Sequence, residues 1–259
     1  MRRALTAATI SSSTSVTAAL LIIGDEILTG RTKDKNIGYI AEYLTGIGID
    51  LREVRVVPDV EEEIVAAVNA LRSRYTYLFT TGGIGPTHDD ITADAVAKAL
   101  GVGIGVDPRA VALLQERYQP HELNEARLRM ARIPGGADLI ENPISKAPGF
   151  RVGNVFVMAG VPSIMQAMLD NIASGLQTGA RMIIETIEAE GLAEGIYAEG
   201  LGQIASSFPS VSIGSYPSFS TSGFRNQIVA RGKDPEAVAN AAAAVRDLLG
   251  RLKGDRAPL

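Results

Sequence analysis

A glycine-rich stretch with two adjacent aspartates is the part of this sequence best suited to chemistry. It runs from Thr80 to Asp90 with the sequence TTGGIGPTHDD, and Gly82, Gly83 and Gly85 are its glycines. Glycines let backbone N–H groups approach an anion closely, and a helix predicted just after Asp90 would point its positive end at the same space. The stretch predicts a phosphate-binding loop, although a glycine-rich connection from strand to helix can equally be only a tight turn.

Carboxylates follow two further predicted strands. Asp25 and Glu26 come after the first strand, and Asp59 comes after the second. Because the ligand site of an open parallel sheet lies beyond the carboxyl ends of its strands, these side chains are expected near Asp89 and Asp90. Carboxylates gathered beside a phosphate repel each other and the phosphate unless a divalent cation lies between them. The pattern therefore indicates a cation and a phosphate at one edge of the sheet.

Each of these residues also has a structural explanation. Asp59 and Asp90 each shortly precede a predicted helix and could cap it by accepting backbone N–H bonds. Asn36 could be another N-cap, and Glu26 a solvent-exposed turn residue. Arg129 most simply lies on the solvent-facing side of a helix, although it could contact a phosphate. Spacing alone does not separate capping from ligand binding.

Composition excludes several classes of site. The 259 residues include no cysteine and only two histidines, which excludes disulfides, thiolate nucleophiles and Cys- or His-rich metal centres, so a metal must bind oxygen ligands. Lys and Arg number 25 against 29 Asp and Glu, a net charge of -4 that gives no basic field for nucleic acid or membrane. No apolar run approaches the ~20 residues that cross a bilayer. We expect a cytoplasmic protein with small-molecule partners.

The elements that must position these residues alternate between short apolar runs and amphipathic stretches of helix length. This alternation predicts an α/β fold, a three-layer, mainly parallel sheet with helices on both faces. Strands are predicted at 17–23, 50–57, 75–81 and 155–158, and helices at 36–44, 61–72, 92–100, 108–118, 123–131 and 163–173. We assign residues 16–178 to this domain and the Ser/Thr-rich residues 1–15 to a disordered extension.

After residue 178 the pattern changes to strand, helix, two strands and helix, which predicts a small α+β (βαββα) domain over residues 179–255. Its order is similar to that of some RNA-binding modules. However, residues 181–259 contain 8 basic and 9 acidic residues and no GxxG stretch, which argues against nucleic acid as a partner. Exposed edges of its sheet predict a homo-oligomer, either a dimer or a trimer.

Several stretches together resemble the molybdopterin-binding-like domain shared by molybdenum cofactor biosynthesis proteins, the competence/damage-inducible CinA family and the N-terminal half of eukaryotic bifunctional FAD synthase. The matching stretches are GDEILTG at 24–30 with Asn36 downstream, VVPD at 56–59, TTGGIGPTHDDIT at 80–92 and AGVPS at 159–163. GSYPS at 214–218 is similar to the last two groups, so the resemblance spans about residues 16–252. Ala159 is a departure, because the family usually has proline there.

The resemblance implies a metal-dependent pyrophosphatase that acts on an ADP-containing dinucleotide such as FAD or ADP-ribose. It implies that Asp59 and Asp90 hold Mg²⁺, Mn²⁺ or Co²⁺, with a monovalent cation as a further option, and that Asp89 assists or takes the proton of the attacking water. The residues expected to contact phosphate or substrate lie in the matching loops: Gly24, Asp25, Glu26, Asn36, Thr81, Gly82, Gly83, Gly85, Pro86, Thr87, Gly160, Pro162 and Ser163.

Two other functions stay open from the sequence. One is a protein of molybdenum cofactor biosynthesis that binds or adenylylates molybdopterin, and the other is a non-catalytic nucleotide- or pterin-binding module. No feature of the sequence separates a flavin pocket from a pterin pocket. The sequence ends at Leu259 without a deamidase domain or the FMN-adenylylating domain of FAD synthase, so we expect no synthesis of FAD from FMN and ATP.

Overall fold

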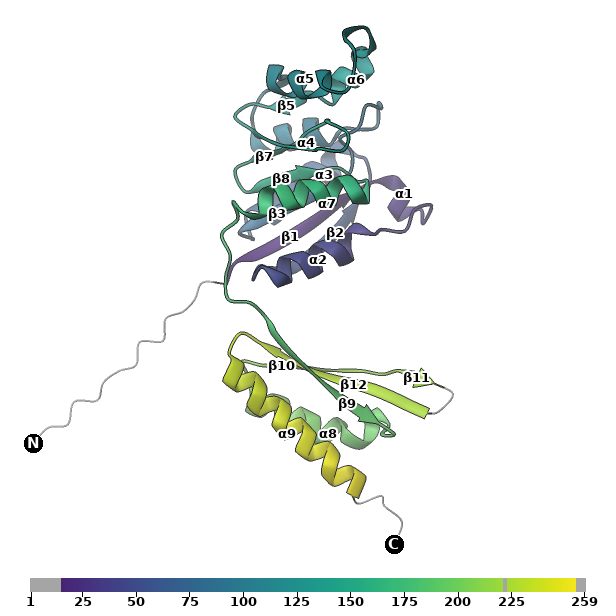
Figure 1. Cartoon of the computed structure of the whole chain (residues 1–259), viewed down its shortest axis with the longest axis vertical. Helices are drawn as coiled ribbons and strands as arrows, with labels where there is room; N and C mark the ends of the chain where they lie inside the picture. Colours follow the sequence, from purple (N-terminus) through teal and green to yellow (C-terminus); the bar gives the residue numbers. More distant parts are fainter. Residues whose placement is uncertain (1–14, 221–222, 255–259) are drawn as a thin grey trace, which may run out of the picture. The chain divides into compact units, whose positions relative to one another are not determined.

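The computed structural model describes residues 15–220 and 223–254, and the chain divides into two compact units, Met1–Gly179 and Ala180–Leu259 (Figure 1). Apart from Ser15, the predicted N-terminal extension lies outside the described residues. Within the described ranges, no helix is long and apolar enough to span a membrane. Each unit has its own hydrophobic clusters and is described by itself.

The first unit is built on a six-stranded sheet with the strand order β2-β1-β3-β8-β7-β6. The first four strands in this order run parallel, and β7 and β6 extend the sheet by antiparallel pairing. The strands are β1 Thr17–Ile23, β2 Asp50–Val57, β3 Tyr77–Thr81, β6 Asp138–Ile140, β7 Gly149–Val152 and β8 Val155–Met158. Because β1 lies between two strands and two helical layers, it is almost wholly buried, which explains its unbroken apolar sequence.

Helices cover both faces of this sheet, so the predicted three-layer α/β fold is confirmed. Ile40 of α2 and Met168 of α7 belong to the core on one face, whereas Ile64 of α3 and Val96 of α4 belong to the core on the other. The helices are α1 Asp25–Leu28, α2 Asn36–Gly46, α3 Glu61–Arg72, α4 Thr92–Leu100, α5 Pro108–Gln115, the 3₁₀ helix η1 Pro120–Glu122, α6 Glu125–Arg129 and α7 Pro162–Ala173. A separate two-stranded sheet pairs β4 (Ile104–Val106) with β5 (Arg132–Pro134).

The structure differs from the sequence prediction mainly in its short elements. The helix predicted at 108–118 ends at Gln115, and the one predicted at 123–131 is only the five-residue α6. The strand predicted from residue 75 begins at Tyr77. The sequence does not predict α1 or strands β4 to β7, which have only three or four residues each.

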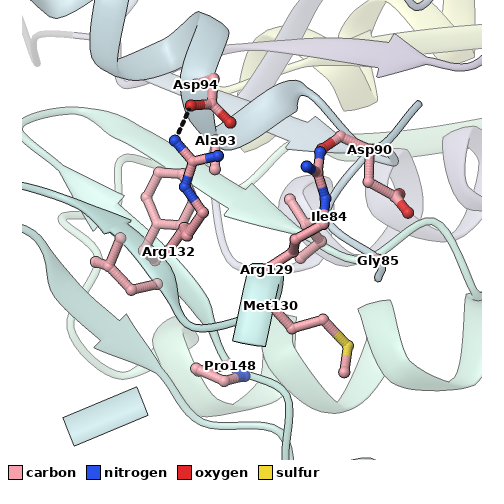
Figure 2. Close-up of a pocket in the computed structure, with 12 residues that line it drawn as sticks. Ile84, Gly85, Asp90, Ala93, Asp94, Arg129, Met130, Arg132 and Pro148 are labelled. Carbon is pink, nitrogen blue, oxygen red and sulfur yellow. Dashed lines mark hydrogen bonds and ion pairs between the residues drawn. The ribbon is translucent and has the colours of Figure 1, made fainter. Parts of the chain in front are cut away.

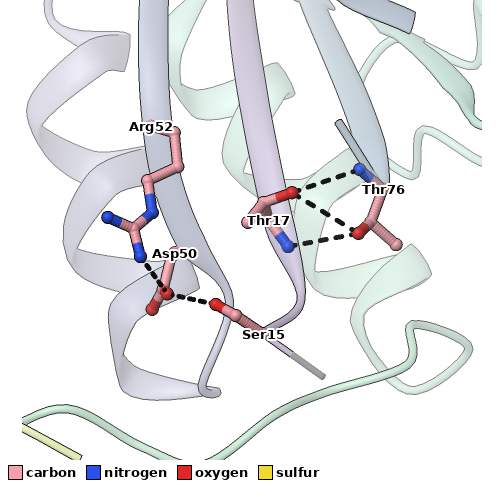
Figure 3. Close-up of polar contacts among 5 residues, drawn as sticks. All are labelled: Ser15, Thr17, Asp50, Arg52 and Thr76. Atoms are coloured by element: carbon pink, nitrogen blue, oxygen red, sulfur yellow. Dashed lines mark hydrogen bonds and ion pairs between the residues drawn. The ribbon is translucent and has the colours of Figure 1, made fainter. Parts of the chain in front are cut away.

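Polar contacts join the amino ends of the first three strands (Figure 3). Ser15 Oγ donates to Asp50 Oδ2 at 2.7 Å, and Arg52 Nη2 donates to the same oxygen at 2.9 Å. The backbone N–H of Thr17 donates to Thr76 Oγ1 at 3.2 Å. The carboxyl ends of the parallel strands lie at the opposite edge, which is where open parallel sheets bind ligands.

The second unit is a small antiparallel sheet with two helices packed on one face. Its elements are β9 Ile183–Glu190, α8 Glu194–Ser207, β10 Ser212–Tyr216, β11 Phe219–Ser220, β12 Gly223–Gly232 and α9 Pro235–Gly254. Strand β12 pairs with the other three strands, and Tyr197 of α8 and Val245 of α9 pack on Ile187 and Ile228 of the sheet. This confirms the predicted α+β region with one addition, β11, whose two residues are too few to give a pattern. The predicted homo-oligomer stays a prediction.

Candidate functional site

A cavity of about 200 Å³ lies at the carboxyl edge of the sheet in the first unit. Its wall is formed by the end of β1, the helix α1, residues 32–36, the residues that end β3, and the turn before α7. Six of the predicted site residues line it: Glu26, Asn36, Thr81, Gly82, Gly160 and Pro162. Segments from four separate parts of the chain therefore meet at one cavity, as expected from the ends of parallel strands.

Sequence reasoning missed the segment between α1 and α2, from which Thr32, Lys33, Asp34 and Lys35 also line the cavity. Lys33 and Lys35 are exposed, and neither has a hydrogen bond or ion pair with any residue that the structure describes. Asp34 Oδ1 accepts the backbone N–H groups of Asn36 at 3.0 Å and Ile37 at 2.7 Å, which fixes the start of α2. The alternating basic residues in RTKDKN, directly ahead of a predicted helix, are the signal that identifies this segment.

Asn36 is the first residue of α2 and not its N-cap, so its interpretation as a cap is wrong. It is only 4% exposed, and its Nδ2 donates to the carbonyl oxygen of Gly160 at 2.9 Å. Because a carbonyl only accepts, this bond settles which end of the amide faces Gly160. Asn36 Oδ1 is left buried without a hydrogen-bond partner, and the same is true of Thr81 Oγ1 in the wall of the same cavity.

The glycines of the predicted phosphate loop have close neighbours within the protein. A Cβ on Gly82 would overlap the carbonyl oxygen of Ile23, and one on Gly83 would overlap the Thr92 hydroxyl, with φ values of +103° and +66°. The Thr92 hydroxyl donates to the Gly82 carbonyl at 2.9 Å, and its backbone N–H donates to the Gly83 carbonyl at 3.0 Å. Packing on β1 and α4 thus requires glycine at both positions, and their role in phosphate binding stays a prediction.

Negative charge gathers around Asp59 at the ends of the strands. Asp59 Oδ2 accepts the backbone N–H of Asp25 at 3.0 Å and does not cap α3, whose N-cap is Val60. Partial burial raises the pKa of Asp59, the bond from the Asp25 N–H opposes this, and the charges of Asp25, Glu26 and Asp89 raise the pKa further. A bound cation would relieve this repulsion.

Asp90 lines a second, smaller pocket, shown in Figure 2. Its Oδ2 accepts from the N–H of Thr87 at 2.8 Å and from the Thr87 hydroxyl at 2.6 Å, so it does not cap α4, whose N-cap is Ile91. Figure 2 shows the Asp90 carboxylate pointing away from Arg129, whose Nη2 donates to the Asp90 carbonyl at 3.3 Å. The pocket, at about 10 Å³, has room for about one water molecule.

The remaining predicted residues do not line the larger cavity. Gly83 and Gly85 line the smaller pocket with Asp90. Neither pocket is lined by the other members of the set, which are Gly24, Asp25, Asp59, Pro86, Thr87, Asp89 and Ser163. No three His, Cys, Asp or Glu side chains within residues 15–220 and 223–254 converge to hold a metal ion by themselves. The assignment of Asp59 and Asp90 as joint metal ligands stays a prediction.

Two family models match the chain, one for each unit. The model described as "Probable molybdopterin binding domain" matches residues 19–178, which is more than half of the chain. The chain belongs to the molybdopterin-binding domain family. The model described as "FAD synthase, middle domain" matches residues 182–254, so the resemblance to FAD synthase is confirmed beyond the molybdopterin-binding domain.

The chain is similar to proteins of Pyrobaculum calidifontis and Aeropyrum pernix. A protein of Pyrobaculum calidifontis is 33% identical over 211 residues, which cover 78% of this chain and 80% of that protein. One from Aeropyrum pernix is 38% identical over 159 residues, 59% of each chain. The crystal structure of CinA from Thermoplasma acidophilum, a protein described as of unknown function, is 35% identical with a TM-score of 0.59 and covers 62% of this chain and 98% of that one. The resemblance to CinA is thereby confirmed.

Proposed function

We propose that this protein hydrolyses the diphosphate of an ADP-containing dinucleotide, such as FAD or ADP-ribose, with the help of a divalent cation. The observation that supports this most is the presence of both positive and negative charge around the 200 Å³ cavity. Lys33 and Lys35 line the cavity and have no partner among the described residues. Glu26 also lines it and is one of the acids that raise the pKa of Asp59. A phosphoric anhydride needs positive groups for its oxygens and a carboxylate-held cation beside them. The match to the FAD synthase middle domain supports a nucleotide-related role.

One helix N-terminus adds to the positive side of the cavity. Helix α7 begins at Pro162, which lines the cavity, and its N-cap residue makes no side-chain hydrogen bond. The helix dipole favours an anion at such an end. The start of α2 does not offer the same site, because Asp34 Oδ1 already accepts the N–H groups of Asn36 and Ile37. The diphosphate lies between the start of α7 and the two lysines, and Ser163 in the first turn of α7 provides a further contact.

The carboxylates around Asp59 fit a cation whose ligand shell is completed by the substrate. Proteins commonly hold Mg²⁺ by one or two carboxylates, and phosphate oxygens and water supply the other ligands. Asp59, whose pKa is raised by burial and by neighbouring acids, is one such carboxylate, and Asp90 is the second. When bound, the cation polarises a phosphoryl oxygen and lowers the pKa of its water. Asp89, exposed beside this group, accepts the proton of the attacking water.

Product analysis tests this proposal directly. The full chain is incubated with FAD, ADP-ribose, NAD or molybdopterin, each with Mg²⁺, Mn²⁺, Co²⁺ or EDTA, and the products are identified by mass spectrometry. We expect FMN and AMP from FAD, or ribose 5-phosphate and AMP from ADP-ribose, only where a cation is present, because the cation supplies the activated water. If no dinucleotide is cleaved with any of the three cations, the proposal is wrong.

The match of residues 19–178 favours a second candidate, a protein that binds or adenylylates molybdopterin. The same screen identifies it when ATP is added to the molybdopterin mixture, because adenylylation transfers an AMP unit from ATP and gives a pterin product heavier by that unit. Binding of a nucleotide or pterin without any product indicates the third candidate, a non-catalytic binding module.

Loss of the two unpaired lysines tests the phosphate-binding side of the cavity. We expect Lys33→Ala combined with Lys35→Ala to raise KM for the cleaved dinucleotide about tenfold or more, because charge-assisted contacts to phosphate are removed. Thermal stability should stay unchanged, because neither side chain has a partner among the described residues. Steady-state kinetics measure the effect, with Arg31→Ala as the control, since Arg31 is exposed in the same segment but does not line the cavity. An unchanged KM contradicts the prediction.

A further inference from the structure

Apolar residues line part of the cavity, and two of its polar lining residues each have a buried oxygen atom without a partner. Ile22, Ile23 and Ile27 contribute the apolar surface. Asn36 Oδ1 and Thr81 Oγ1 are both buried and make no hydrogen bond with the described residues. Sites for small organic molecules are mostly apolar, with a few polar groups that orient the ligand. This part of the wall therefore suits a flat heterocycle better than a bare phosphate.

The chemistry of the two oxygens defines the edge that such a heterocycle must present. Asn36 Oδ1 only accepts, because the Nδ2 of the same amide is occupied by the Gly160 carbonyl. The Thr81 hydroxyl can donate. A buried polar group without a partner costs free energy, so partners are expected in the ligand-bound state. A matching edge has an N–H donor next to an acceptor. Adenine and pterin both have such an edge, as an exocyclic amino group beside a ring nitrogen.

We propose that Asn36 and Thr81 recognise the aminoheterocycle of the ligand. The amino group donates to Asn36 Oδ1, and the adjacent ring nitrogen accepts from the Thr81 hydroxyl. The heterocycle packs on the isoleucines, and its phosphates reach the exposed Lys33 and Lys35 at the same cavity. Identification of the heterocycle as the adenine of a dinucleotide rests on the proposed function, and a pterin would present the same edge to the same atoms.

Two neighbouring threonines of β3 provide a variant and its matched control. Thr80 and Thr81 are both buried, and both hydroxyls lack partners, but only Thr81 lines the cavity, because successive side chains of a strand face opposite sides of the sheet. Neither Thr80→Val nor Thr81→Val breaks a hydrogen bond of the free protein, so both should keep or raise Tm. Isothermal titration with ADP should show Kd increased about tenfold by Thr81→Val and unchanged by Thr80→Val.

Ligand analogues test the Asn36 oxygen without any mutation. ADP is compared with purine riboside 5′-diphosphate, which lacks the amino group, and pterin is compared with 4-hydroxypteridine, which lacks it too. We expect the amino compound of one pair to bind about tenfold or more tightly than its analogue, because the analogue leaves the buried acceptor unpaired. The pair that shows this preference distinguishes adenine from pterin as the source of the amino group.

The outcomes separate this inference from the proposed function. Equal affinities within both pairs, an absence of binding by both amino compounds, or wild-type affinity of Thr81→Val would each overturn the inference. If FAD or ADP-ribose is hydrolysed in that case, the proposed function stands without it. Selective binding of ADP that weakens in Thr81→Val, in a protein that hydrolyses nothing, supports the inference and contradicts the proposed function.

Discussion

Asp59→Asn is expected to reduce cation-dependent hydrolysis by a factor of about 10² or more, because the loss of a ligand charge removes several kcal/mol of stabilisation from the transition state. The fold should be retained, because the asparagine oxygen can still accept the N–H of Asp25, which lies 3.0 Å from Asp59 Oδ2. Asp90→Asn should behave alike, because its side-chain oxygen can still accept from Thr87. Initial rates with the best dinucleotide and cation measure both effects.

Stability distinguishes this loss of activity from damage to the fold. The pKa of Asp59 is raised in the folded protein, chiefly by partial burial. The folded state therefore keeps its proton to higher pH than the unfolded chain, and the ionised carboxylate destabilises the cation-free protein at neutral pH. Asp59→Asn removes this cost. The free energy of unfolding of Asp59→Asn should therefore exceed that of the wild type. The difference should increase as the pH rises from 3.8, the ordinary pKa of aspartate, through the raised pKa of Asp59, and should be constant at higher pH.

Asp247→Asn is the control for both measurements. Asp247 is exposed on α9 of the second unit, so the same chemical change there should alter neither hydrolysis nor the pH dependence of stability. If Asp59→Asn hydrolyses the dinucleotide at nearly the wild-type rate, the cation must be held elsewhere. If its stability relative to the wild type is independent of pH, the pKa of Asp59 is not raised in the folded protein.

The position of the site could be predicted from sequence because of the fold class. A strand buried on both faces, such as β1, shows as a continuous apolar run, and parallel strands bring their carboxyl ends to one edge. Glu26, Gly82 and Gly160 could therefore be assigned to one site although they lie far apart in the chain, and all three line the 200 Å³ cavity.

The roles of individual side chains were less accessible from sequence. Asp59 and Asp90 lie at positions where N-caps are common. However, the N-cap residues are Val60 and Ile91, one position later in each case. The two carboxylates instead accept hydrogen bonds from the N–H groups of Asp25 and Thr87. Lys33 and Lys35 were missed because charged residues in a loop are usually only solvated. Their position in the wall of the cavity depends on the path of the chain between α1 and α2, which no local pattern specifies.

Gly82→Ala is expected to lower the free energy of unfolding by about 2 to 5 kcal/mol. The left-handed φ of +103° costs an L-residue about 1 to 2 kcal/mol, and the added methyl group would overlap the Ile23 carbonyl, a backbone atom at the end of β1 that cannot rotate away. Overpacking of this kind costs about 1 to 3 kcal/mol more. Urea unfolding of the full chain, with the first unit followed by its own spectroscopic signal, measures the change.

Gly30→Ala separates the two contributions. Gly30 has a similar left-handed φ of +72°, but a Cβ there would have nothing within 4 Å, so only the backbone cost of about 1 to 2 kcal/mol is expected. A larger loss for Gly82→Ala than for Gly30→Ala therefore measures the packing of the loop on β1. If Gly82→Ala instead unfolds like the wild type but no longer binds ADP, glycine is required at this position for the approach of a ligand and not for the contact with Ile23.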